Sequence, residues 1–244
     1  MPKFFLSDSK FRKSDVIEIK GDDAHHISKT LRMKVGDALT VTSSDGMDYL
    51  CLIDAFTPDA VILTVQEVIP SDVEGDIKIS IFQALVKGDK METVIQKSVE
   101  LGVSEIYPVS AERSVMKLDS SGERKKLERW NKIALEAAKQ CGRGFVPTVH
   151  NVISFEECVR KMGEQDVSFF CYELAEGKTV KDVIGGKNFS SVGFYIGPEG
   201  GVAPKEAELA RSYGIEAVSL GKLILRTETA GPAVLSMLLY ETRL

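Results

Sequence analysis

The feature that most restricts the fold of this chain is a change of hydrophobic pattern near residues 70–76. Before it, several short stretches rich in β-branched and aromatic residues follow one another, separated by turns. After it, apolar stretches typical of strands alternate with stretches of helical periodicity. Consecutive strands without helices favour a small β-barrel, whereas strand–helix alternation favours a mostly parallel sheet with helices on both faces. We therefore expect an α/β protein with an additional β-rich N-terminal barrel.

The pattern predicts a β-rich domain at residues 1–70, a linker at 71–76 and an α/β domain at 77–244. The linker is acidic, follows a proline and has no periodicity. In the first domain, strands are expected at residues 16–19, 39–42, 49–56 and 60–68, and a short helix from Asp22 or Asp23 to Leu31. In the second, strands are expected at 77–85, 105–109, 167–172, 192–196 and 217–220, and helices at 90–101, 123–141, 154–162, 204–213 and 229–242.

Composition excludes several functional classes. Hydrophobic residues make up 43% and charged residues 27% of the chain, which is typical of a folded protein. No apolar run approaches the roughly 20 residues that cross a bilayer, so we expect a cytoplasmic protein without a membrane partner. The four cysteines have no C-x-x-C spacing and the three histidines form no ligand motif, so no metal site is expected.

Two stretches of the chain are basic, although the net charge of the chain is -5. Residues 1–34 contain eight basic and five acidic residues, and residues 110–145 contain nine basic and five acidic residues. Two basic stretches in an acidic protein indicate a localised RNA-binding surface. The alternative is that these charges belong to solvated helix faces.

The first candidate binding segment lies at residues 197–201, between an apolar strand and a helix. Its three glycines let a ligand approach the backbone closely, while Pro198 stiffens the turn. A plain tight turn is the alternative. The chain contains neither G-x-G-x-x-G nor G-x-x-x-x-G-K-[ST], so dinucleotide and nucleoside triphosphate binding are disfavoured.

The second candidate segment, residues 220–232, is an apolar stretch interrupted by Arg226, Thr227, Glu228 and Thr229. A strand leading into a helix with a threonine N-cap would explain the threonines but not the charges. Because charged groups after an apolar run are costly to desolvate unless they pair or meet a ligand, we favour a binding site.

These two segments resemble the second and third motifs of SPOUT-class methyltransferases. Residues 87–90 and 96–103 resemble the first motif of the branch that methylates N3 of a uridine in 16S ribosomal RNA. Residues 25–32 are similar to the PUA-like RNA-binding domain of that branch, and residues 137–143 are similar to its central segment. The chain as a whole thus resembles the 16S rRNA uridine-N3 methyltransferase (RsmE-type) family.

The resemblance implies a C-terminal trefoil knot, a homodimer, 16S rRNA of the small ribosomal subunit as partner and S-adenosyl-L-methionine as methyl donor. Leu220, Ile224 and Leu225 are expected to line the adenine site, because apolar walls suit a flat heterocycle. The residues expected to hold the donor are Gly197, Pro198, Glu199, Gly200, Gly201, Leu220, Gly221, Ile224, Leu225 and Arg226.

For catalysis, Arg226 is the leading candidate, because its guanidinium can stabilise the charge that develops on the uracil oxygens as N3 loses its proton. Its alternative role is a structural pair with Glu228. Glu199 and Glu228 are candidate general bases, and bound water is a further alternative. The residues expected to face RNA are Arg12, Lys13, Arg32, Lys87, Lys90, Lys97, Gln140 and Arg143. Two other functions stay open: ribose 2'-O methylation and RNA binding without catalysis.

Overall fold

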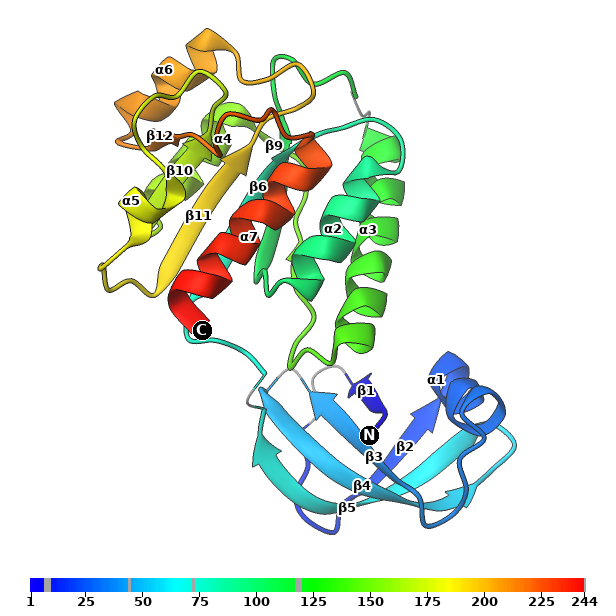
Figure 1. The fold of residues 1–244 in the computed structure, drawn as a ribbon. Coiled ribbons are helices and arrows are strands. Elements are labelled where there is room, and N and C mark those ends of the chain that lie inside the picture. The colour runs from blue at the N-terminus through cyan, green and yellow to red at the C-terminus, as the bar shows by residue number, and fades with distance from the viewer. Residues whose placement is uncertain (7–9, 44, 72, 117–119, 244) are drawn as a thin grey trace. The chain divides into compact units, whose positions relative to one another are not determined.

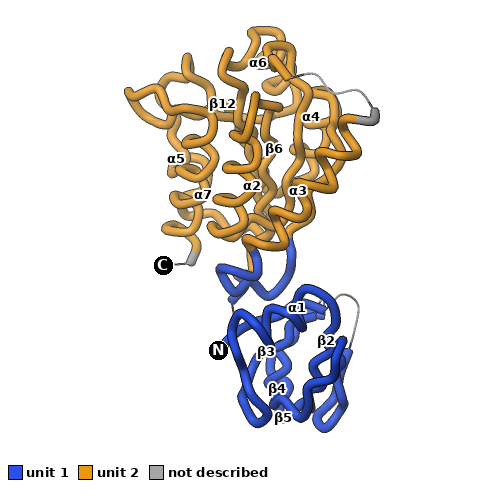
Figure 2. The backbone as a smooth tube through the Cα atoms, turned by 90° about the vertical axis from the view of Figure 1, so that its right-hand side faces the viewer, with its two compact units in different colours: residues 1–74, 138–146 blue, residues 75–137, 147–244 orange. Residues whose placement is uncertain are grey.

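The computed structural model describes residues 1–6, 10–43, 45–71, 73–116 and 120–243. They form two compact units, which Figure 2 colours separately. Unit 1 consists of Met1–Glu74 and Ala138–Val146, and unit 2 of Gly75–Ala137 and Pro147–Leu244. No helix among the described residues is long and apolar enough to cross a membrane.

Unit 1 is built on a five-stranded sheet with the strand order β1-β3-β4-β5-β2. Its strands are β1 (Lys3–Leu6), β2 (Val16–Lys20), β3 (Ala38–Ser43), β4 (Met47–Phe56) and β5 (Ala60–Pro70). Strand β1 pairs in parallel with β3, and the other neighbours are antiparallel. Side chains alternate as the pattern predicted: Ile17 and Ile19 are buried, whereas Glu18 between them is exposed. Helix α1 (Gly21–His25) continues as the π-helix η1 (His26–Thr30).

An ion pair ties two distant segments of unit 1 together. The Arg143 guanidinium donates to the Glu74 carboxylate at 2.8 Å, and the backbone N–H of Gly144 donates to the same carboxylate at 2.7 Å. The guanidinium also lies over the Phe145 ring, 4.7 Å from its centroid. Glu74 belongs to the segment predicted as a linker, so this segment has a specific partner within the unit.

Unit 2 contains a parallel sheet with the strand order β12-β10-β11-β6-β7-β8, and the short β9 pairs with β7. The strands are β6 (Lys78–Ala84), β7 (Glu105–Ser110), β8 (Thr148–Val149), β9 (Ile153–Ser154), β10 (Val167–Cys171), β11 (Ser191–Ile196) and β12 (Glu216–Val218). The helices are α2 (Lys90–Glu100), α3 (Ser120–Cys141), α4 (Phe155–Gly163), α5 (Val180–Ile184), α6 (Pro204–Ser212) and α7 (Thr227–Arg243). Figure 1 shows their positions around the sheet.

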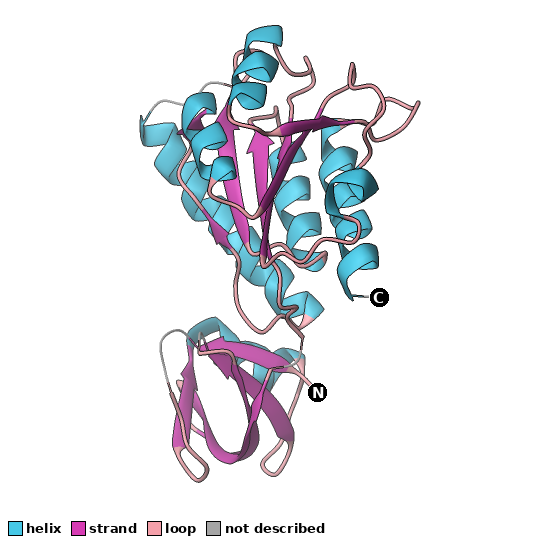
Figure 3. Ribbon diagram, turned by 90° about the vertical axis from the view of Figure 1, so that its left-hand side faces the viewer, coloured by secondary structure: helices cyan, strands magenta, loops and turns pink. Residues whose placement is uncertain are grey.

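Helices cover both faces of this sheet (Figure 3). On one face, Phe82, Phe170 and Tyr195 form a core cluster with residues of α4 and α6, such as Cys158 and Ala207. On the other face, α7 contacts α2 and α5. A Cβ added to Gly231 of α7 would lie only 3.0 Å from Ile81 of β6, so glycine lets this helix approach the sheet closely. The predicted α/β architecture with a parallel sheet is confirmed.

Several elements differ from those expected. Strand β1, helix α5 and the two-residue strands β8 and β9 were not predicted. Helix α5 carries a recognisable signal, because Thr179 and Asp182 form a capping box at its start. The last strand was expected at residues 217–220 but is observed at Glu216–Val218. It is an edge strand whose pairing with β10 ends at Val218, opposite Cys171.

Candidate active site

Loops that leave the carboxyl ends of parallel strands gather at one edge of the unit 2 sheet, where ligands bind in such folds. Residues 85–89 follow β6, residues 172–179 follow β10, residues 197–203 follow β11 and residues 219–226 follow β12. Hydrogen bonds connect them. For example, the N–H of Ser219 donates to the carbonyl of Lys178 at 2.9 Å. The Thr227 hydroxyl donates to the Gly197 carbonyl at 2.8 Å, so the two segments predicted from sequence are also neighbours in space.

The loop at residues 197–201 is closely packed against its surroundings. The N–H of Gly201 donates to the Pro198 carbonyl at 2.9 Å, and Nη1 of Arg113 donates to the Gly200 carbonyl at 3.0 Å. A Cβ on Gly197 would lie 3.1 Å from a methyl group of the buried Val202, and one on Gly200 would lie 3.1 Å from Cβ of Arg113. These glycines leave no room for a side chain, and their backbone is held in one arrangement.

A buried hydrogen-bond chain fixes this loop to the start of α7. The Thr227 hydroxyl donates to the Gly197 carbonyl at 2.8 Å and accepts from Nε2 of Gln83 at 2.9 Å. Gln83 is 0% exposed and also donates to the carbonyl of Ala84 at 3.1 Å. Among the described residues, its Oε1 has no hydrogen-bond partner. Gln83 thus connects β6 with Thr227 in the second predicted segment and, through Thr227, with Gly197 in the first.

Glu199 is engaged by a lysine. Its carboxylate accepts from Nζ of Lys90 at 2.8 Å. Partial burial raises the pKa of Glu199, but the hydrogen bond and charge of Lys90, together with hydrogen bonds from the backbone N–H groups of Glu199 and Lys87, outweigh it, and the pKa lies below the usual range. The same hydrogen bond raises the pKa of Lys90. Both groups are therefore charged at neutral pH, and Glu199 is a weaker candidate base than an unpaired carboxylate.

The structural pair between Arg226 and Glu228, which was the alternative role for Arg226, is not formed: no ion pair joins them in the described part of the chain. Arg226 is exposed, whereas Oε2 of Glu228 is buried without a hydrogen-bond partner there. The charges of both residues act on Lys90, so these three groups and Glu199 form one charged cluster. Arg226 is free to meet a ligand because it is not held by Glu228.

The loop at residues 219–226 is held at its start, where the N–H of Gly221 donates to the Ser219 hydroxyl at 3.2 Å, and its middle is exposed. Gly221 has a φ of 109° and would have nothing within 4 Å of an added Cβ. Ile224 is 91% exposed and Leu223 is 81% exposed, while Leu220 and Leu225 are partly buried. The expected apolar wall is therefore only partly assembled, because Ile224 projects into solvent.

Most residues predicted to face RNA are at the surface. On unit 1, Arg12, Lys13, Arg32 and Gln140 are exposed. On unit 2, Lys87 is exposed, Lys90 pairs with Glu199, and Lys97 pairs with Glu100 at 2.8 Å. Arg143 differs from the others, because its side chain is only 5% exposed and is bound to Glu74 within unit 1.

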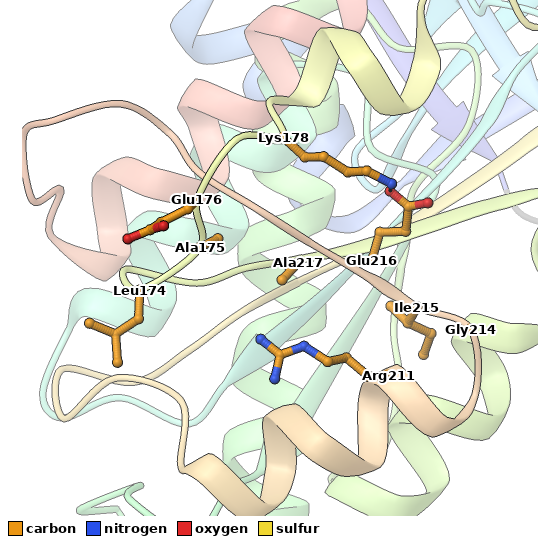
Figure 4. Close-up of a pocket in the computed structure, with 9 residues that line it drawn as sticks. All are labelled: Leu174, Ala175, Glu176, Lys178, Arg211, Gly214, Ile215, Glu216 and Ala217. Atoms are coloured by element: carbon orange, nitrogen blue, oxygen red, sulfur yellow. Dashed lines mark hydrogen bonds and ion pairs between the residues drawn. The ribbon is translucent and has the colours of Figure 1, made fainter.

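The segment after β10 was not singled out from sequence, yet it borders the same edge of the sheet. With the end of α6 and strand β12, it lines a cleft of about 430 Å³ (Figure 4). Lys178 pairs with Glu216 at 2.6 Å in this cleft, and the Arg211 guanidinium lies 5.8 Å from the centroid of the Tyr172 ring. The sequence signal that could have identified the segment after β10 is its position directly after a buried strand. Gln83 was also missed, although it is the single polar residue between Ile81 and Val86.

No group of three or more His, Cys, Asp or Glu side chains that could hold a metal ion occurs among the described residues.

Comparisons with known proteins agree with this geometry. A family model described as RNA methyltransferase domain matches residues 73–239. The ribosomal RNA small subunit methyltransferase E of Bacillus subtilis is 36% identical over 100% of this chain and 98% of its own length. Two solved structures have a TM-score of 0.87 and cover 98% of this chain and 97% of their own. One is a Legionella pneumophila methyltransferase in complex with the cofactor SAM, 30% identical; the other is a Neisseria gonorrhoeae ribosomal RNA small subunit methyltransferase E bound to S-adenosyl methionine, 28% identical.

Proposed function

Because this chain belongs to the ribosomal RNA small subunit methyltransferase E family, we propose that it transfers a methyl group from S-adenosylmethionine to N3 of one uridine in 16S ribosomal RNA. The observation that carries the proposal is the closely packed loop at residues 197–201 next to Arg226. The two solved structures that match this chain with a TM-score of 0.87 both contain bound S-adenosylmethionine.

The residues of unit 2 fit this donor. Bound there, S-adenosylmethionine supplies an electrophilic methyl group on a sulfonium. The glycines at 197 and 200 let this loop pack closely against Val202 and Arg113, and the donor is proposed to lie against the backbone surface that this packing fixes. Leu220 and Leu225 offer apolar surface to the adenine, and Ile224 completes it if the loop at 219–226 closes over the donor.

Arg226 is proposed to act on the uracil. Removing the N3 proton places negative charge on O2 and O4, and the exposed guanidinium can donate two directional hydrogen bonds to such an anion. N3 lies on the pairing edge of the base, so the target uridine has to be unpaired or flipped out of a helix.

Glu228 is the better placed of the two candidate bases. Its Oε2 is buried and has no hydrogen-bond partner among the described residues, whereas Glu199 is bound to Lys90. We propose that Glu228 accepts the N3 proton, directly or through one water molecule.

Three further proposals concern architecture. Unit 1 serves as a PUA-like RNA-binding domain, as its five-stranded sheet and exposed basic residues suggest.

The segment after β12 forms a trefoil knot. In support, β12 lies at the edge of the sheet, while the following α7 packs back over β6 and contacts α2 and α5. The protein forms a homodimer, for which Met237 and Tyr240 on one side of α7 offer exposed apolar surface.

The function is tested by incubating the protein with S-adenosylmethionine and small ribosomal subunits from cells that lack it. Nucleoside analysis of the digested RNA should reveal 3-methyluridine. Appearance of 2'-O-methyluridine would replace the proposal by ribose methylation, and absence of any methylated nucleoside would favour RNA binding without catalysis. Gly200→Val, whose side chain would press against Arg113, serves as the inactive control.

A further inference from the structure

Unit 1 contains a cleft of about 790 Å³ between the α1–η1 helix and the turn that joins β4 to β5. Every residue that lines it belongs to unit 1. Its size lies within the range of small-molecule sites, roughly 300–1,000 Å³. Ala24, Met33 and Val61 contribute apolar surface, and Lys20 and Lys29 contribute ammonium groups. The cleft therefore combines an apolar floor with positive charge.

An exposed aromatic ring stands at one side of this cleft. Phe56, the last residue of β4, is 36% exposed. The turn that follows is fixed by reciprocal hydrogen bonds: the N–H of Thr57 donates to the Ala60 carbonyl, and the N–H of Ala60 donates to the Thr57 hydroxyl, both at 2.9 Å. Phe56 is thus presented on a rigid turn, which is the arrangement that a stacking platform needs.

The opposite wall of the cleft has an irregular backbone. It includes the π-helical turn η1, and π-turns occur frequently at functional sites. Shortly after η1, Arg32 adopts a φ of 52°, which is unfavourable for a residue with a side chain. Within the described residues Lys29 has no ion-pair partner, whereas Lys20 pairs with Glu18 at 2.9 Å. Lys29 is therefore the lysine available to an anion.

We propose that this cleft binds one unpaired nucleotide of the RNA substrate, with the base stacked on Phe56 and the phosphate at Lys29. Proteins bind single-stranded RNA by stacking bases on aromatic side chains beside basic residues, and this cleft offers both. Asp59 on the turn disfavours a phosphate at that side, which orients the phosphate toward Lys29. The inference rests on the proposed function, because it takes RNA as the ligand.

The test uses the full chain and short RNA oligonucleotides, one single-stranded and one a fully paired duplex. Phe56→Leu keeps apolar bulk but removes the aromatic face, and Phe56→Trp keeps it. Val35→Ala, an exposed apolar residue of unit 1 that does not line the cleft, is the matched control. Affinity is measured by fluorescence polarisation, and stacking by quenching of a 2-aminopurine placed in the single strand.

We expect Phe56→Leu to weaken single-strand binding by about 5- to 100-fold and to abolish quenching, since base–aromatic stacking supports effects of this size. Phe56→Trp and Val35→Ala should bind like the wild type, and duplex binding should not change in any variant. Lys29→Gln should reduce the salt dependence of single-strand binding by about one unit of slope.

Equal single-strand affinity in Phe56→Leu and Val35→Ala would overturn the inference, as would an equal loss for single-stranded and duplex RNA. The proposed function fails separately. If the wild type leaves ribosomal RNA unmethylated while Phe56→Leu still loses quenching, nucleotide binding in the cleft is supported and the proposed methylation is wrong. If methylation occurs and quenching is unchanged in Phe56→Leu, only the cleft is wrong.

Discussion

The loop after β11 and the loop after β12 are both expected to contact the methyl donor, but the protein holds them very differently. The loop at residues 197–201 is fixed by Arg113, by Thr227 and by its own backbone hydrogen bond. The loop at residues 219–226 places Leu223 and Ile224 in solvent. The first is thus a preformed surface that limits what can bind, and the second is free to adapt to the ligand. In such a site the fixed loop positions the ligand, and the exposed loop lets the ligand enter and leave.

The largest expected effect is on catalysis at the end of the adaptable loop. Arg226→Lys keeps the charge but loses the planar fork, so the single-turnover rate at saturating RNA and donor should fall about 10²- to 10³-fold. The melting temperature should stay unchanged, because Arg226 is exposed. Lys222→Arg, in the same exposed loop, is the control and should react at the wild-type rate. A wild-type rate in Arg226→Lys would remove this residue from catalysis.

The next effect tests whether the loop at residues 219–226 closes over the donor. Trypsin should cleave the free protein after Lys222, which is exposed in the adaptable loop. If this loop closes over the donor, S-adenosylmethionine at a hundred times its Kd should slow that cleavage by up to about 100-fold. Lys187, exposed in the segment before β11, provides an internal control whose cleavage should not change. Equal cleavage at Lys222 with and without donor would show that the loop does not close.

A smaller effect is expected from the connection that fixes the preformed loop. Thr227→Val removes the hydroxyl that joins Gln83 to the Gly197 carbonyl and leaves buried polar groups without a partner. The free energy of unfolding should fall by about 1–3 kcal/mol, and donor affinity should fall with it.

Thr227→Ser retains the hydroxyl and is the matched control for this connection. It should restore donor affinity measured by calorimetry, even if some packing is lost. A Thr227→Val protein that binds donor as tightly as the wild type would mean that the preformed loop does not depend on this hydrogen bond.

The sequence predicted the features that depend on local patterns, and the loop at residues 197–201 is one of them. Glycine spacing and the preceding apolar strand indicated the loop at 197–201, because close backbone packing can be satisfied there only without side chains. Helix periodicity located α2, α4, α6 and α7 to within a few residues. Such features are local, so they are visible in a single stretch of sequence.

Features that depend on distant partners were not predictable. The Gln83 side chain acquires its role only because β6 brings it to Thr227, which is 144 residues away. Arg143 looked like an RNA contact in a basic stretch, but Glu74, which is 69 residues away, binds it within unit 1. Strand β1 is short and is completed by pairing with β3. In each case a tertiary contact decides what the residue does.

The smallest expected effect separates the two exposed apolar residues of the adaptable loop. Both Ile224→Ala and Leu223→Ala should leave the free energy of unfolding within about 0.5 kcal/mol of the wild type, because neither side chain is buried in the folded protein. If Ile224 covers the adenine when the loop closes, only Ile224→Ala should weaken donor binding, by about 3- to 10-fold for the apolar surface it no longer buries. Calorimetric titration of both variants with S-adenosylmethionine measures the difference. Equal affinities would mean that Ile224 stays in solvent, and the adenine site would then be formed by Leu220 and Leu225 without it.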